Sequence, residues 1–255
     1  MKPTQQLHNL GQSLWLDNIT RGHLVNGTLR RYIGELSITG LTSNPSIFDH
    51  AIKESNFYDD AIHVKMKQGK FGEALFYELA IEDLRQAADL FRPIYDRTNG
   101  IDGWVSLEVS PTLAHDTQGT IVEVPRLRAR AERPNLFVKI PGTPEGVPAI
   151  EESIFAGVPV NVTLLFSREQ YLAAAEAYLR GIERRIQMGL NPDVCSLSAD
   201  GGDAEEMIAK FARAGIDCDK LATDLQREAA ESFVKDWHEL LASLVAKSAG
   251  FKPPG

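Results

Sequence analysis

Short apolar segments alternate with longer segments of helical periodicity, and this order restricts the fold more than any other feature of the chain. The predicted strands are 13–17, 38–41, 104–109, 136–140, 158–165 and 193–197. The predicted helices are 24–36, 51–68, 72–91, 112–131, 149–156, 168–188, 204–214 and 220–248. Strands that alternate with helices are typical of βαβ units. The sequence therefore predicts an α/β fold with a parallel sheet.

Three local signals mark where elements begin and end. Ser167 is a predicted N-cap for the helix at 168–188. The segment TSNP at 42–45 predicts a turn after the second strand. Pro125 is expected to end or kink the helix at 112–131, because proline lacks the backbone N–H of that turn.

Composition excludes several classes of protein. The 255 residues carry 27 Lys and Arg against 35 Asp and Glu, a net charge of −8, which argues against general binding to nucleic acid or to an anionic membrane. No segment has the length and apolarity of a membrane span, and the first 18 residues lack the apolar run of a signal peptide. Cys195 and Cys218 cannot form a disulfide framework, so we expect a cytoplasmic protein.

Known cofactor motifs are missing from the sequence. The six histidines show no metal-ligand spacing, and no glycine-rich nucleotide-binding motif follows a strand. We therefore expect neither a metal nor an organic cofactor.

Lys139 is the most informative single residue. It lies within the apolar strand sequence NLFVKIPGT. Burial disfavours an ammonium ion, and an uncharged lysine amine is a nucleophile that forms a Schiff base with a carbonyl. A lysine at a strand end can also extend to solvent or pair with an acid, and this alternative stays open from the strand alone.

Polar residues recur at or near the predicted carboxyl ends of five successive strands. They are Asp17, Asn44, Glu108, Lys139, Asn161 and Thr163. In a parallel α/β enzyme these ends converge on one side of the sheet. Each residue has a structural alternative: Asp17 and Asn44 are also suited to capping, Asn161 to bonding a backbone group, and Thr163 to a strand. Together they favour an active site.

Five sequence segments carry a resemblance to a known family. They are WLDN at 15–18, GLTSNPSIF at 40–48, VSLEVSPTLAHDT at 105–117, RPNLFVKIPGTPEG at 133–146 and VNVTLLFS at 160–167. In order and spacing the chain resembles transaldolases, Schiff-base enzymes of the non-oxidative pentose phosphate pathway. The resemblance implies a TIM-type (β/α)₈ barrel. It also implies transfer of a dihydroxyacetone unit from sedoheptulose 7-phosphate or fructose 6-phosphate to an aldose phosphate.

The resemblance implies a role for each of the strand-end residues. Lys139 corresponds to the imine lysine and Asp17 to the acid and base. Glu108 and Thr163 correspond to a proton relay through a water. The two asparagines, Asn44 and Asn161, correspond to residues that hydrogen-bond substrate hydroxyls.

The resemblance is interrupted after residue 197. Residues 199–217 and 232–241 resemble the closing helices of the family, whereas its last strands and its phosphate-binding arginine have no counterpart. We therefore expect a single domain over 1–255, with a barrel portion at 1–197 and C-terminal helices at 199–255. About six strands would leave the barrel incomplete, where eight close it.

An incomplete barrel exposes two strand edges. The C-terminal helices could fill the gap, two chains could cover each other's edges as a homo-oligomer, or the chain could fold poorly; we favour association. We also expect weak binding of sugar phosphates, because Arg168, Arg184 and Arg185 lie on a predicted helix rather than in a phosphate site. The alternative functions are those of a truncated paralogue without turnover that associates with another chain, and of an aldolase for small unphosphorylated carbonyls.

Overall fold

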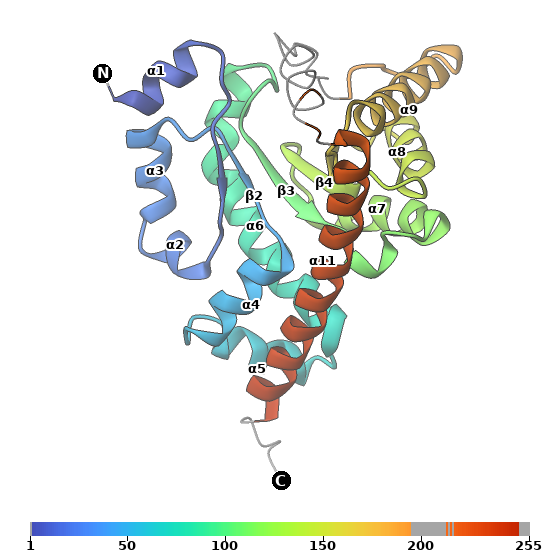
Figure 1. Cartoon of the computed structure of the whole chain (residues 1–255). Coiled ribbons are helices and arrows are strands. Elements are labelled where there is room, and N and C mark those ends of the chain that lie inside the picture. The colour runs from blue at the N-terminus through green and yellow to red at the C-terminus, as the bar shows by residue number, and fades with distance from the viewer. Residues whose placement is uncertain (1, 195–212, 214, 216, 250–255) are drawn as a thin grey trace. The chain divides into compact units, whose positions relative to one another are not determined.

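The computed structural model describes residues 2–194, 213, 215 and 217–249. It confirms the α/β class. Five parallel strands are hydrogen-bonded in the order β1-β2-β3-β4-β5, which is also their order in the chain. Figure 1 labels β2, β3 and β4 of this sheet. The strands are β1 Trp15–Asp17, β2 Gly40–Thr42, β3 Trp104–Glu108, β4 Leu136–Pro141 and β5 Val160–Thr163. The described strands do not close into a barrel, since β1 and β5 stand at the two ends of this order.

Helices precede, connect and follow these strands. Those before β3 are α1 Pro3–Asn9, α2 Arg21–Val25, α3 Thr28–Leu36, α4 Pro45–Lys53, α5 Asp59–Lys67 and α6 Gly72–Arg97. Those after β3 are the 3₁₀ turn η1 Pro111–Leu113, α7 Thr117–Ala131, α8 Gly146–Phe155, α9 Arg168–Gln187 and α11 Cys218–Ala249. Among the described residues, no helix has both the length and the apolarity needed to cross a membrane.

Two compact units divide the described chain. The first contains the residues up to Glu108, Arg126–Val138 and those from Phe233 onward. The second contains Val109–Pro125 and the residues from Lys139 to Ser232. The predicted boundary at 197–199 lies outside the described residues and stays a prediction.

The core of the first unit lies between α6 and its neighbours. α6 packs against β3, and the aromatic rings of Phe76 and Tyr77 on α6 contact Trp237 of α11. A buried polar group lies in the same unit: Asp83 accepts hydrogen bonds from Arg21 Nε at 2.8 Å and from the Tyr58 hydroxyl at 2.9 Å. Both partners satisfy a carboxylate that would be costly to bury alone.

An aromatic layer fills one face of the first unit's strands. The ring of Phe137 stacks on Trp104 with centroids 3.9 Å apart and on Trp15 with centroids 6.2 Å apart. Gly40 pairs with both tryptophans in the strand register, and a Cβ atom there would lie 2.4 Å from the Trp15 ring. The absence of a side chain at Gly40 makes room for the layer.

The second unit contains the other half of β4, β5, and the helices that follow them. α8 packs against both α9 and β5. α9 begins as predicted: the Ser167 hydroxyl accepts from the Gln170 backbone, and the Gln170 side chain returns a bond to the Ser167 backbone. Such reciprocal bonds satisfy two N–H groups that the first helical turn leaves without helical partners.

Several predicted helix bounds are wrong. The helix at 24–36 is split by Gly27, whose φ of 78° is left-handed. The helix at 51–68 is split between Lys53 and Asp59, where Tyr58 turns inward to reach Asp83.

Two prolines do not end their helices. α6 continues past the predicted end at residue 91 and includes Pro93, and α7 includes Pro125. Pro125 is exposed, whereas Val124 and Leu127 beside it are fully buried. Burial of these apolar neighbours outweighs the lost backbone hydrogen bond.

The sixth predicted strand is not seen in the described part of the chain. Asp193 and Val194 are not in a strand, and 195–197 lie outside the described residues. The predicted helix at 204–214 also falls almost entirely outside them.

The close approach at Gly40 gives a first prediction. We expect Gly40→Ala to lower the free energy of unfolding by about 1–3 kcal/mol, because the added methyl group would displace the Trp15 ring from the aromatic layer. Equilibrium unfolding in urea measures this change.

Gly34→Ala is the matched control. Gly34 lies exposed within α3, and a Cβ atom there would have no neighbour within 4 Å. We expect the free energy of unfolding of this variant to rise by about 0.5–1 kcal/mol, since alanine is the better helix former. An unchanged urea midpoint in Gly40→Ala would contradict the close packing described above.

Candidate active site

Lys139 lies inside the sheet rather than at its surface. It is the fourth residue of β4 and is 5% exposed, and its neighbours Val138 and Ile140 are fully buried. Its carbonyl oxygen accepts from the Val109 backbone N–H at 3.1 Å, which ties this part of β4 to the end of β3. Extension of the amine into solvent does not fit this burial. Pairing with an acid, the other structural alternative, is compatible with it.

Asn161 and Thr163 accompany Lys139 in the second unit. They are the second and fourth residues of β5, so the alternation of a strand places them on one face of it. Both are partly exposed. The carbonyl oxygen of Thr163 accepts from the Gly142 N–H at 2.7 Å, which joins the ends of β4 and β5.

Asp17 and Glu108 end two strands of the first unit. Asp17 is the exposed last residue of β1, and Glu108 is the last residue of β3 and is 6% exposed. Alternation along each strand places Asp17 on the face of Trp15, and Glu108 on the face of Trp104. The two carboxylates therefore occupy the same face of the sheet as the aromatic layer, displaced toward the carboxyl ends of the strands.

Sequence reasoning missed Ser106. The register pairs Asp17 with Thr42 and Thr42 with Ser106, so these three residues form a row across β1, β2 and β3. Ser106 is fully buried, two residues before Glu108 on the same face. The two-residue spacing of Ser106 and Glu108 in WVSLE could have indicated it, because residues two apart on a strand lie on the same face.

Asn44 has the capping role that the sequence left open as an alternative. It is the N-cap of α4, and its Oδ1 accepts from the Ile47 backbone N–H at 3.3 Å and from the Ser46 hydroxyl at 3.0 Å. Its side-chain oxygen is therefore occupied. The amide NH₂ is the group with which Asn44 could donate to a substrate hydroxyl.

Hydrogen bonds connect the loops after β3 and β4 in the second unit. The Thr143 hydroxyl donates to the Ala114 carbonyl at 2.5 Å, and the Thr117 hydroxyl donates to the Glu145 carbonyl at 2.6 Å. His115 Nδ1 lies 3.1 Å from a carboxylate oxygen of Glu145. This contact lowers the pKa of Glu145 below its usual value. The loops at this edge of the second unit are thus held in place.

Two of the three arginines considered for phosphate binding already have partners. Arg184 donates to the carboxylates of Glu151 and Glu152, with contacts of 3.0 and 2.6 Å. Arg185 donates to the carbonyl oxygens of Phe155 and Asn191. These bonds hold both guanidinium groups against α8 and the chain after α9, so neither is arranged as a phosphate clamp.

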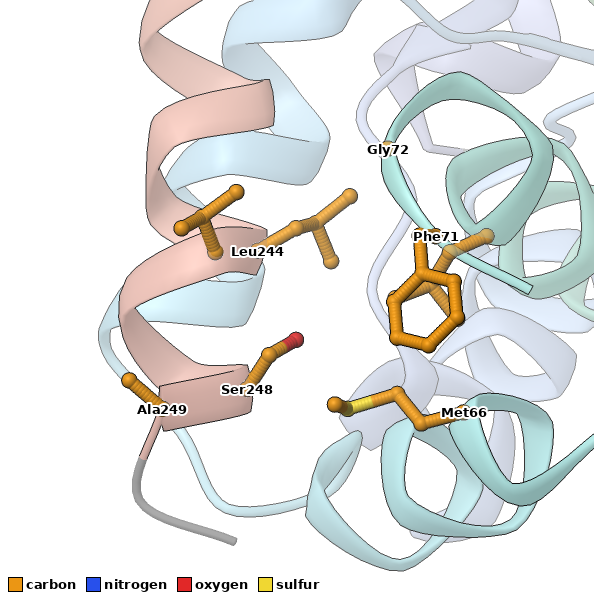
Figure 2. A pocket seen from close by; sticks show the side chains of 8 residues that line it. Met66, Phe71, Gly72, Leu244, Ser248 and Ala249 are labelled. Atoms are coloured by element: carbon orange, nitrogen blue, oxygen red, sulfur yellow. The ribbon is translucent and has the colours of Figure 1, made fainter. Parts of the chain in front are cut away.

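A pocket of about 300 Å³ in the first unit lies apart from the predicted chemistry. It is lined by Met66, Phe71, Gly72, Leu75, Leu244, Val245, Ser248 and Ala249. Figure 2 shows Ser248 pointing into it, with the side chains of Phe71 and Met66 on the opposite side. None of these lining residues carries a charge, so the pocket does not supply acid, base or amine chemistry. The described residues also contain no group of three His, Cys, Asp or Glu side chains that could hold a metal ion.

The structure thus distributes the six predicted site residues over the two units. Asp17, Asn44 and Glu108 belong to the first, and Lys139, Asn161 and Thr163 to the second. The fold and these residues define a parallel α/β protein with polar side chains at or near the carboxyl ends of its strands and a buried lysine on β4.

Comparisons with known proteins give the family. Residues 14–197 match the family described as Transaldolase/Fructose-6-phosphate aldolase. The chain belongs to this family. The match ends at residue 197, the position after which the sequence lost its resemblance to the later strands.

Curated relatives agree with this membership. A transaldolase of Trichodesmium erythraeum is 45% identical over 188 residues, which are 74% of this chain and 50% of the relative. A transaldolase of Thiobacillus denitrificans is 47% identical over 189 residues, 74% of this chain and 53% of the relative. Transaldolase 1 of Streptomyces avermitilis is 40% identical over 217 residues, 84% of this chain and 57% of the relative. The chain spans about half the length of these relatives.

The cap at Asn44 gives a second prediction. Asn44→Ala should lower the free energy of unfolding by about 1 kcal/mol, because the N–H of Ile47 loses its acceptor. Asn44→Ser should stay within about 0.5 kcal/mol of the parent, since serine is a comparable N-cap. Urea unfolding of the two variants measures both values. Equal stability of Asn44→Ala and the parent would show that the cap does not stabilise α4.

Proposed function

We propose that the chain carries out transaldolase-type chemistry, in which Lys139 forms a Schiff base with a ketose and retains a dihydroxyacetone unit. The observation that carries the proposal is a lysine buried within β4 in a member of the transaldolase family. A lysine amine is a nucleophile that forms a Schiff base with a ketone carbonyl. The donors are sedoheptulose 7-phosphate or fructose 6-phosphate, and the acceptors are aldose phosphates.

The first half of the reaction forms the imine. The amine of Lys139 adds to the ketone carbon, and the resulting carbinolamine loses water to give an iminium ion. Glu108, with Thr163 and a bridging water, passes the one proton that the nitrogen loses on addition to the former carbonyl oxygen. A further proton, taken up from solvent through the same relay, lets the hydroxyl group leave as water. Glu108 suits such a role because it is largely buried at the end of β3. The proposal requires Lys139 and Glu108 to face a common space.

The second half breaks and remakes a carbon–carbon bond. The Asp17 carboxylate takes the proton of the C4 hydroxyl while the C3–C4 bond breaks, and the bonding electrons move toward the iminium nitrogen. An aldose leaves, and an enamine with three carbons stays on Lys139. The enamine then attacks the aldehyde carbon of the acceptor, Asp17 returns the proton to the new hydroxyl oxygen, and hydrolysis of the imine frees the ketose product. The imine is the electron sink, so these steps invoke no cofactor.

Substrate hydroxyls are bound by the two asparagines in this proposal. Asn161 lies on the same face of β5 as Thr163, and Asn44 offers its NH₂ group while its oxygen caps α4. Arg184 and Arg185 are not arranged to bind the substrate phosphate, because their guanidinium groups have other partners. We therefore expect weak binding of sugar phosphates. An aldolase for small unphosphorylated carbonyls is the variant of the proposal in which phosphate adds nothing to binding.

A second candidate function is association with another polypeptide without turnover. One observation favours it: β1 and β5 are the end strands of the described sheet. A homo-oligomer would then cover the strand edges. Pairing of edges in this way satisfies backbone groups that an open sheet leaves to solvent.

Trapping with borohydride separates these candidates. Incubation with fructose 6-phosphate and sodium borohydride should add a stable sugar-derived mass to Lys139, found by peptide mapping. Lys139→Met should abolish the adduct, because methionine keeps the apolar volume without the amine. Lys235→Met is the matched control, since Lys235 is 76% exposed. This variant should leave the adduct unchanged.

A folded protein without any adduct would favour association, and an adduct that persists in Lys139→Met would place the chemistry elsewhere. Dihydroxyacetone as the donor tests whether phosphate contributes to binding.

The role of Asp17 gives a further prediction. Asp17→Asn should still form the imine but cleave the C3–C4 bond at least about 100-fold more slowly, the usual range for loss of a positioned base. The trapped adduct should then carry the whole ketose instead of the three-carbon unit, which mass spectrometry distinguishes. A three-carbon adduct formed at the parent's rate would show that Asp17 is not the base.

A further inference from the structure

One side chain of α11 holds the ends of two strands in the second unit. The Nε2 of Gln226 donates to the carbonyl oxygen of Gly142 at 2.9 Å and to that of Leu164 at 2.8 Å. Gly142 is the first residue after β4, and Leu164 is the first residue after β5. An amide NH₂ group has two hydrogens, so the two bonds use its full donor capacity.

The backbone is closely fitted where these bonds form. The Gly142 N–H donates to the Thr163 carbonyl at 2.7 Å, and a Cβ atom on Gly142 would lie 2.4 Å from Leu165 Cδ2. Leu164 has a φ of 62°, in the left-handed region that is unfavourable for residues other than glycine. It is also 6% exposed, so water has little access to compensate for a lost bond. Contacts around Leu164 must therefore hold this conformation.

The two strand ends carry residues of the proposed reaction. Lys139 precedes Gly142 by three residues, and Thr163 immediately precedes Leu164. A shift of one strand end against the other would therefore move the amine relative to the Thr163 hydroxyl. Imine formation is sensitive to such shifts, because reacting groups need near-contact geometry.

We propose that Gln226 is a positioning residue, which fixes the carboxyl ends of β4 and β5 against each other and thereby places Lys139 relative to Thr163. Gln226 lies 84 residues from Gly142 and 62 from Leu164 in the sequence. A helix that follows the strands at a distance thus determines the geometry at their ends. The consequence for Lys139 rests on the proposed function, whereas the strand junction itself does not.

Amide hydrogen exchange tests the junction directly. Gln226→Met keeps the length of the side chain and removes both donors. Exchange of the Gly142 N–H, which bonds to Thr163, should become about tenfold faster, the effect expected when one or two hydrogen bonds are lost. Gln86→Met is the matched control: Gln86 is exposed on α6, and the acceptor described for its amide is a carbonyl of its own helix, that of Glu82. This control should leave exchange at Gly142 unchanged.

Gln226→Asn provides a second, gentler variant. It keeps the amide group but shortens the side chain by one carbon, so that it cannot reach both carbonyl oxygens. Exchange at Gly142 should again accelerate, which supports the proposal even where Gln226→Met does not fold. Exchange at Gly142 within about twofold of the parent in a folded Gln226 variant overturns the proposal, since two lost bonds should exceed this.

The rate of borohydride trapping tests the consequence for Lys139. At saturating fructose 6-phosphate, the Gln226 variants should form the adduct about tenfold more slowly, with the same final amount of adduct and an unchanged half-saturating concentration. A merely structural role would lower the fraction of folded protein, and so the final amount, without slowing the folded fraction. An unchanged rate overturns the positioning role. Where the parent protein forms no adduct, the proposed function fails, and exchange at Gly142 alone decides the assignment of Gln226.

Discussion

The stacked rings of Trp15, Phe137 and Trp104 occupy the face of the strands on which the candidate catalytic residues also lie. They fill one face of β1, β3 and β4 at its amino end, in the space that Gly40 leaves. Because side chains alternate along a strand, residues two or four positions later emerge on the same face beyond the rings. Asp17 and Glu108 occupy these positions. The aromatic layer therefore lies next to them, toward the amino ends of the strands.

Lys139 follows the same alternation along β4, two residues after Phe137. Its burial is unusual, as is that of Glu108, since lysine and glutamate side chains are rarely buried without a partner. In the proposed function this amine is the nucleophile that forms the Schiff base. Two hydrogen bonds hold this part of β4 in place. The Val109 N–H donates to the Lys139 carbonyl oxygen, and the Gln226 side chain donates to the Gly142 carbonyl oxygen at the end of the strand.

Much of the fold could be predicted from local patterns, and the candidate site residues stay predictions. The apolar runs located all five described strands, and the Ser167 cap located the start of α9, because both signals lie within a few residues of what they determine. Helix bounds were harder where distant contacts decide them. The predicted helix at 51–68 is interrupted between Lys53 and Asp59. Tyr58 in this interruption bonds to Asp83, and this contact has no signature in the sequence near residue 58.

Contacts between residues far apart in the sequence could not be predicted from local patterns. Ser106 joins the row of Asp17 and Thr42 only through strand pairing, and Gln226 meets Gly142 and Leu164 only through the fold. Asn44 shows the opposite case, in which the local role as a cap and a role toward substrate use different atoms of one amide.

The central claim is that the amine of Lys139 and the carboxylate of Asp17 face one reaction space. A crystal structure of the protein after reduction of its ketose adduct tests this most directly. The account predicts a sugar-derived chain on Lys139 Nζ, with a carboxylate oxygen of Asp17 within hydrogen-bonding distance, about 3 Å, of one of its hydroxyls. An adduct on Lys139 that points away from the face of Trp15 and Trp104, with Asp17 out of reach, would contradict it.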